Sequence, residues 1–162
     1  MERVGITGHQ RLEEVGRWSW VREQVRLSLT ETDGPLAGLT SLAVGVDQLF
    51  AEEVVKLGGR VVAVLPFREY AERVPASERD TYHDLLAHAS EAWVLPRVSD
   101  ADEECYLYAG KMIVENCDRL IAVWDGQRAR GIGGTADIVE YARLRGRRTA
   151  WINPDLGVVR TL

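Results

Sequence analysis

The feature that most constrains the fold of this chain is a strand, a glycine-rich loop and a helix start in residues 118–142. Leu120–Trp124 is an unbroken apolar run, which is typical of a central parallel strand covered on both faces. Asp125-Gly126 ends this run, and Gly133–Thr135 stands where a helix begins. Glycines let the backbone approach a ligand closely, and the N–H groups of a helix start attract an anion such as phosphate. The same pattern also suits an ordinary tight connection between a strand and a helix.

Strands and helices alternate along the rest of the chain. Apolar runs predict strands over 3–7, 39–44, 60–65, 92–95, 120–124 and 149–152. Helical spacing predicts helices over 18–31, 48–57, 75–90, 99–116 and 135–144. This alternation predicts an α/β fold, a Rossmann-like three-layer sandwich with a mainly parallel central sheet. The length of 162 residues predicts a single domain over 1–162.

Composition excludes several classes of function. The hydrophobic content of 46% and the charged content of 28% are ordinary for a soluble globular protein. A formal net charge of -5 argues against a nucleic-acid partner, and no apolar run is long enough to span a membrane. Cys105 and Cys117 are too few and too far apart for a disulfide scaffold or a metal cluster. We therefore expect a cytoplasmic protein with no metal, no cofactor and reduced core cysteines.

The candidate ligand site follows from the strand order. Ligands of a parallel α/β sheet bind beyond the carboxyl ends of the strands, so the loops at 8–11, 45–48, 66–67 and 125–135 should meet at one rim. The candidate ligand-binding residues in these loops are Gly8, His9, Arg11, Gly45, Asp47, Pro66, Asp125, Gly126, Gly133, Gly134 and Thr135.

Each polar candidate also has a structural alternative. His9 suits contact with a phosphate or a base, and equally a role in a turn. Arg11 offers a planar fork to a phosphate, although a solvated arginine needs no ligand. Asp47 suits ligand contact and helix capping about equally. Trp18 and Trp20 on an early helix would suit a contact between subunits, so we expect a homo-oligomer.

Four segments together carry a resemblance to a known family: Gly5–Leu12, Ala43–Asp47, Val64–Phe67 and Gly133–Asp137. In these the chain resembles the SLOG superfamily, Rossmann-like domains shared by DNA-processing proteins, Lonely Guy phosphoribohydrolases and sensors of nucleotide-derived signals. The resemblance covers nearly the whole chain. It implies a pocket for a small-molecule nucleotide, nucleoside or ADP-ribose-like ligand. From the residues we expect a sensor or carrier domain that binds the phosphate of this ligand at the Gly133–Thr135 helix start. Molybdenum-cofactor carriage also fits such a fold.

The closing motif is also similar to that of nucleoside deoxyribosyltransferases, which implies an enzymatic alternative. In those enzymes and in Lonely Guy enzymes, a glutamate that acts on the ribosyl bond falls four residues after the motif glycine. Counted from Gly134, that position is Ile138, which cannot ionise or attack an anomeric carbon. Asp137 lies one residue earlier in the first helical turn. It is the candidate catalytic residue if the chain is an N-glycosidic-bond hydrolase or transferase.

Overall fold

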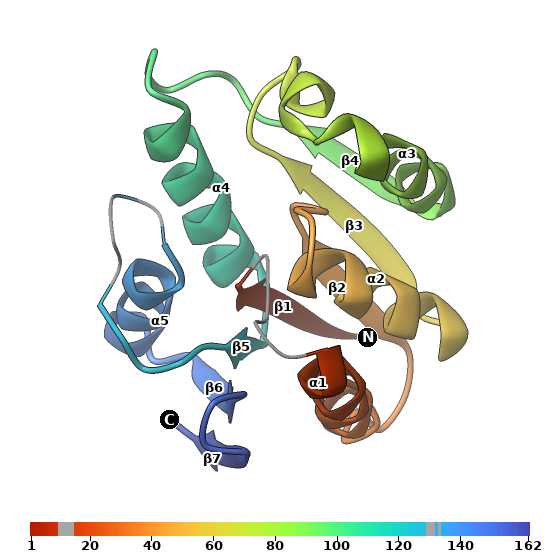
Figure 1. The fold of residues 1–162 in the computed structure, drawn as a ribbon, viewed down its shortest axis with the longest axis vertical. Helices are drawn as coiled ribbons and strands as arrows, with labels where there is room; N and C mark the ends of the chain where they lie inside the picture. The colour runs from red at the N-terminus through yellow and green to blue at the C-terminus, as the bar shows by residue number, and fades with distance from the viewer. Residues whose placement is uncertain (10–14, 129–131, 133) are drawn as a thin grey trace.

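The computed structural model describes residues 1–9, 15–128, 132 and 134–162, and within them one seven-stranded sheet forms the centre of the molecule (Figure 1). The strands are β1 (Glu2–Gly8), β2 (Leu36–Thr40), β3 (Arg60–Leu65), β4 (Glu91–Val94), β5 (Arg119–Val123), β6 (Arg148–Asn153) and β7 (Val158–Thr161). Their order is β4-β3-β2-β1-β5-β6-β7, and all neighbours are parallel except β6 and β7.

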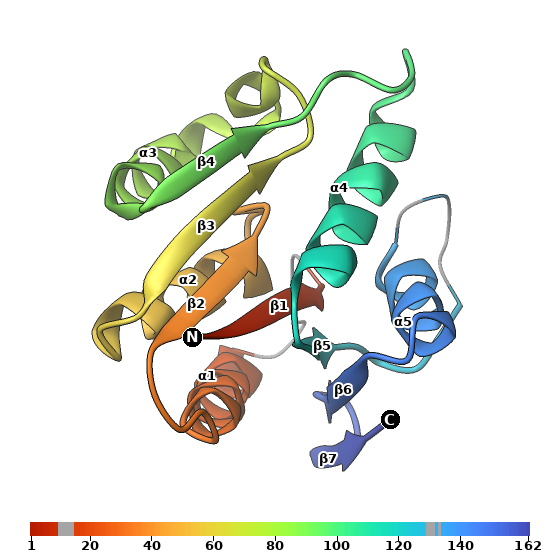
Figure 2. The same ribbon diagram turned by 180° about the vertical axis from the view of Figure 1, so that it is seen from behind.

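Helices cover both faces of this sheet, as Figures 1 and 2 show from opposite sides. They are α1 (Val15–Leu29), α2 (Val46–Lys56), α3 (Arg79–His88), α4 (Asp102–Asn116) and α5 (Thr135–Leu144), with short 3-10 helices η1 (Tyr70–Arg73) and η2 (Ala76–Glu78) before α3. One core packs α1 to α3 against the sheet, and a second core packs α4 and α5 against its other face. The predicted Rossmann-like α/β fold with a mainly parallel sheet is therefore confirmed.

The central strand β5 shows why the two cores form. All five of its residues are buried. Side chains alternate between the faces of a strand, so Leu120 enters the core beneath α4 and α5, whereas Ile121 enters the core beneath α1 and α2. The unbroken apolar run in the sequence is thus the consequence of burial on both faces.

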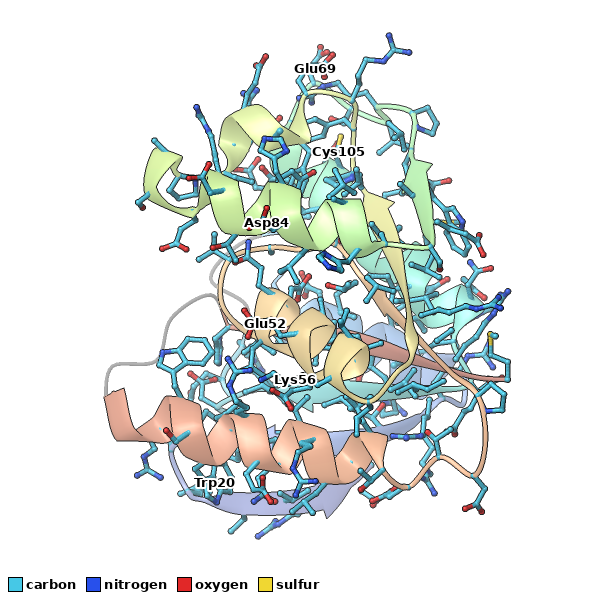
Figure 3. All side chains as sticks on the ribbon, turned by 90° about the vertical axis from the view of Figure 1, so that its right-hand side faces the viewer. Trp20, Glu52, Lys56, Glu69, Asp84 and Cys105 are labelled. Carbon is cyan, nitrogen blue, oxygen red and sulfur yellow. The ribbon has the colours of Figure 1, made fainter. Side chains whose placement is uncertain are left out.

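The helices on the first face are also joined by ion pairs. Figure 3 looks onto α1, α2 and α3, with Trp20, Glu52 and Lys56 labelled. The guanidinium of Arg22 on α1 donates to Glu52 at 2.8 Å and to the buried Glu53 at 2.6 Å.

Among the described helices, none is both long and apolar enough to cross a membrane.

Two sequence predictions about the strands were wrong. The second strand is 36–40 rather than 39–44, because Leu42 adopts a left-handed backbone conformation (φ 56°) that ends it. The Thr40 hydroxyl accepts the Leu42 N–H at 3.0 Å, and the Leu42 carbonyl accepts the Gln48 side-chain N–H at 3.2 Å. The antiparallel edge strand β7 was not predicted, because its side chains are mostly exposed and carry no clear apolar alternation.

A buried arginine ties the sheet together at the amino ends of its strands. Arg119, the first residue of β5, donates to the Glu2 carboxylate of β1 at 3.0 Å. Its guanidinium also donates to the Ser28 carbonyl of α1 at 2.8 Å and to the Ser28 hydroxyl at 3.2 Å. This arginine network lies at the amino ends of the strands. The candidate site was predicted at the opposite edge of the sheet, at the carboxyl ends.

Candidate functional site

The strand order reverses its direction of growth at β1. The chain builds β2, β3 and β4 outward on one side of β1 and then returns through α4 to place β5 on the other side. Such a reversal leaves a crevice beyond the carboxyl ends of the strands, and ligands of open α/β sheets bind there. A pocket of about 410 Å³ lies at this place, lined by the end of β1, the loops after β2 and β3, and residues of α4 and α5. Its volume is within the range of pockets that hold one small molecule.

Six of the predicted ligand-binding residues line this one pocket, although they come from four separate loops. They are Gly8, His9, Asp47, Pro66, Gly134 and Thr135. Gly45, Asp125 and Gly126 lie in the adjoining turns and are not part of its lining. Arg11 and Gly133 lie outside the described residues. The role of all these residues in ligand binding stays a prediction.

Gly8 lets β1 end directly against the start of α2. A Cβ atom built on Gly8 would lie 2.7 Å from Cγ1 of Val46 and 3.1 Å from Cβ of Val123. Gly45 precedes α2 with φ 97°, a conformation that favours glycine. Both glycines therefore have a packing or backbone reason to be where they are, and together they bring α2 close to the pocket.

His9 is held in place by the turn after β5. The backbone N–H of Asp125 donates to Nε2 of His9 at 3.2 Å. The Asp125 carboxylate accepts the Gln127 N–H at 2.9 Å and lies 3.6 Å from the same histidine nitrogen. Asp125 therefore shapes its own turn and positions a histidine that lines the pocket.

Asp47 places a buried carboxyl group in the pocket wall. Its Oδ2 atom accepts the Ser41 N–H at 3.1 Å and the Ala43 N–H at 3.4 Å. Burial raises the pKa of Asp47 to about 6, against the opposing effect of these hydrogen bonds. The side chain does not cap α2, whose first residue is Val46. It instead holds the loop at 41–43, which contributes Ser41 and Ala43 to the same pocket.

The start of α5 forms another wall. Gly134 is the residue before the helix, and Thr135 is its first residue. The N–H groups of Asp137 and Ile138 both donate to the Gly134 carbonyl, at 3.1 and 3.4 Å. Gly134 has no side chain with which to cap this helix start. The start of a helix carries unpaired N–H groups and the positive end of the helix dipole, which favours an anion at such a place.

An isoleucine, Ile138, occupies the position of the expected catalytic glutamate. Ile138 is 3% exposed, lines the pocket and belongs to the core beneath α4 and α5. It packs so closely on α4 that a Cβ atom built on Gly110 would lie 2.4 Å from Cδ1 of Ile138. Asp137, the alternative catalytic candidate, is partly buried and is not among the described residues that line the pocket.

Sequence reasoning missed the residues that the segment after β3 and the helix α4 bring to the pocket. Tyr70 and Arg73 of η1 and Tyr106 of α4 all line it. The ring centroids of Tyr70 and Tyr106 are 6.1 Å apart, and Phe67 contacts both rings. The one available signal was the concentration of aromatic residues after Pro66.

No family model and no curated protein sequence matches this chain, whereas several solved structures have a similar fold. DNA processing protein A from Streptococcus pneumoniae has a TM-score of 0.63 at 14% identity, covering 93% of this chain and 50% of that one. The same-named protein from Helicobacter pylori, solved to show its single-stranded DNA binding mode, has a TM-score of 0.62 at 13% identity and coverages of 93% and 64%. The chain thus spans between half and two thirds of the length of these two proteins.

The molybdenum cofactor binding protein from Rippkaea orientalis has a TM-score of 0.62 at 18% identity, covering 96% of this chain and 78% of that one. The chain shares the Rossmann-like fold of these three proteins, which is the fold that the resemblance to the SLOG superfamily implied. The prediction against a nucleic-acid partner gains no support from them, because one neighbour binds single-stranded DNA. The homo-oligomer and the cytoplasmic location stay predictions.

Proposed function

We propose that this protein is a sensor or carrier domain that binds a phosphorylated, nucleotide-like small molecule without cleaving it. The observation that supports this function most is the pocket at the carboxyl ends of the strands, in which Ile138 occupies the position of the expected glutamate. A pocket with convergent polar groups favours ligand binding. A buried isoleucine has no proton to transfer and no lone pair with which to attack a ribosyl bond.

The phosphate of this ligand would bind at the start of α5. Gly134 and Thr135 line the pocket, and Gly134 has no side chain with which to cap the helix. An anion at this place gains hydrogen bonds from those groups and a favourable interaction with the helix dipole. The Thr135 hydroxyl adds a further donor.

The buried Asp47 carboxyl gives the ligand an orientation. An ionised carboxylate accepts hydrogen bonds and repels a phosphate, so the pocket wall at Asp47 suits a donor such as a sugar hydroxyl or an amino group. The ligand would therefore point its phosphate toward α5 and a hydrogen-bond donor toward Asp47. A nucleoside phosphate meets both of these requirements.

A thermal-shift screen tests the proposal. The ligands are adenosine monophosphate, ADP-ribose, cyclic nucleotides, deoxynucleosides, molybdenum cofactor and a single-stranded oligonucleotide. We expect one phosphorylated small molecule to raise the melting temperature. At a ligand concentration of 100 times its Kd, the free energy of unfolding should increase by about 2.7 kcal/mol. Its dephosphorylated form should have little effect, and incubation followed by chromatography should release no free base.

Other outcomes would contradict the proposal in distinct ways. Base release that Asp137→Asn abolishes, with binding retained, would establish the N-glycosidic-bond hydrolase or transferase. Stabilisation by the oligonucleotide alone would replace the small molecule with a nucleic acid. No stabilisation by any of these ligands would return the glycine loop to the role of a plain connection between β5 and α5.

A further inference from the structure

Two arginines share a single carboxylate beside the pocket. Nε of Arg73, in η1, lies 2.6 Å from Oδ2 of Asp102, the first residue of α4. Nη2 of Arg97 lies 2.7 Å from the other carboxylate oxygen of Asp102. Arg73 lines the pocket, whereas Arg97 does not. These hydrogen bonds hold the pKa of Asp102 below its ordinary value, so Asp102 is ionised at neutral pH.

Arg97 is held by other contacts as well. Its guanidinium carbon lies 4.1 Å from the centroid of the Phe67 ring, a close cation–π distance, whereas that of Arg73 lies 5.8 Å away. Arg97 also donates to the Ser99 carbonyl at 3.1 Å. The Arg73 side chain is 43% exposed. Arg97 is therefore the fixed partner of Asp102, and Arg73 is the partner that can leave more easily, since exposed ion pairs contribute little to stability.

The place of Arg73 in the fold separates it from the start of α5. Arg73 follows β3 and α5 follows β5, and the sheet order puts β2 and β1 between these strands. Arg73 and the start of α5 therefore belong to different walls of the pocket.

We propose that Arg73 binds a second anionic group of the pocket ligand, leaving Asp102 to Arg97. The ligand is then a molecule with two separated oxyanion groups, and Arg73 determines its specificity by offering a planar fork that suits phosphate or carboxylate. This inference rests on the proposed function for the identity of the pocket as a ligand site. It goes further in assigning the charge at the ligand's other end.

The test uses inorganic phosphate as the probe and NMR of the whole chain, labelled with ¹⁵N. Arginine Nε–H and backbone N–H signals are followed as phosphate is added at constant ionic strength. We expect the Arg73 Nε–H signal to shift in a saturable way while the Arg97 signal does not. Arg73→Gln should weaken binding at this end at least tenfold, the ratio expected from losing a hydrogen bond to a charged group.

Arg97→Gln tests the sharing of Asp102, because it leaves the carboxylate to Arg73. Arg73 should then stay on Asp102 and the phosphate response of η1 should weaken, whereas Arg73→Lys should restore part of the affinity that Arg73→Gln loses. No saturable shift at Arg73, or equal shifts at Arg73 and Arg97, would overturn the inference. The Thr135 N–H signal reports on α5 independently. A response at Arg73 without one at Thr135 would support this inference and contradict the proposed phosphate site at α5. A response at Thr135 without one at Arg73 would overturn this inference and support the phosphate site at α5.

Discussion

Asp47 is a residue whose surroundings act in opposite directions on its charge. Two backbone N–H groups stabilise the carboxylate, yet burial in the pocket wall has the larger effect and raises its pKa to about 6. The folded protein therefore binds a proton between about pH 4 and pH 6, where the unfolded chain has already released it. By linkage, the free energy of unfolding falls as pH rises through this interval and is level above it.

Asp47→Asn should remove this dependence on pH. The shift from 3.8 to about 6 corresponds to about 3 kcal/mol, so the wild type should lose about that much relative to the variant between pH 4 and pH 7. Urea unfolding of both proteins at a series of pH values measures the difference. Asp102→Asn is the control, because the pKa of Asp102 is lowered and its contribution disappears only below about pH 4. A constant difference between wild type and Asp47→Asn would show that burial does not control this carboxyl group.

The helices α4 and α5 pack against each other at a glycine of α4. Gly110 of α4 receives the end of Ile138 of α5, at a distance that leaves no room for a Cβ atom. The contact fixes α5 against α4 and so fixes where the start of α5 faces the pocket. A core contact of this kind also explains why position 138 carries hydrocarbon rather than an acid.

Gly110→Ala should therefore destabilise the protein by about 1 to 3 kcal/mol, although alanine is the better helix former. Ile138→Val removes the Cδ1 atom that lies 2.4 Å from the added Cβ. In that background the same glycine substitution should cost about 1 kcal/mol less. A double-mutant cycle by urea unfolding measures this coupling. Equal costs in the two backgrounds would refute the close contact.

The sequence predicts the bounds of helices and strands that local residue patterns define. It does not predict the bounds that depend on contacts with other parts of the chain. The bounds of α5 and β3 match the prediction, because a glycine loop and an apolar run define them. The end of β2 depends on the left-handed conformation of Leu42, whose carbonyl accepts a hydrogen bond from the Gln48 side chain of the following helix α2. In the candidate site, the convergence of Gly8, Asp47 and Thr135 follows from the parallel strands, whose carboxyl ends meet at one edge of the sheet. Arg73 instead reaches the pocket from the short 3-10 helix η1, which has no apolar period in the sequence.

At the scale of the whole molecule, the two ends of the sheet carry different tasks. The buried Arg119 network joins β5, β1 and α1 at the amino ends, and the pocket lies at the carboxyl ends. Arg119 is 3% exposed, and its hydrogen bonds satisfy groups that would otherwise be buried without partners. We therefore expect the stability gained at one end to be independent of the side chains that face the pocket at the other.

Arg119→Gln should lower the free energy of unfolding by about 2 kcal/mol, the scale of lost hydrogen bonds to a charged group. The NMR response of the pocket to phosphate should stay at the wild-type value. Arg148→Gln is the matched control at the same end of the sheet. Its partner is Glu31 at 3.0 Å and its side chain is 60% exposed, so the substitution should cost less than about 1 kcal/mol. A change in the phosphate response of Arg119→Gln would show that the two ends are coupled.

The arginine network has a practical consequence for protein engineering. Random libraries restricted to the pocket-lining positions of the loops at 41–45 and 66–75 that are not buried alter the walls of the pocket and leave every donor and acceptor of Arg119 in place; these positions are Ser41, Ala43, Val44, Arg73 and Pro75. A directed-evolution campaign for a new ligand can therefore draw most of its diversity from these positions. The fraction of variants that still fold should be higher there than in a library of equal size spread over the whole chain.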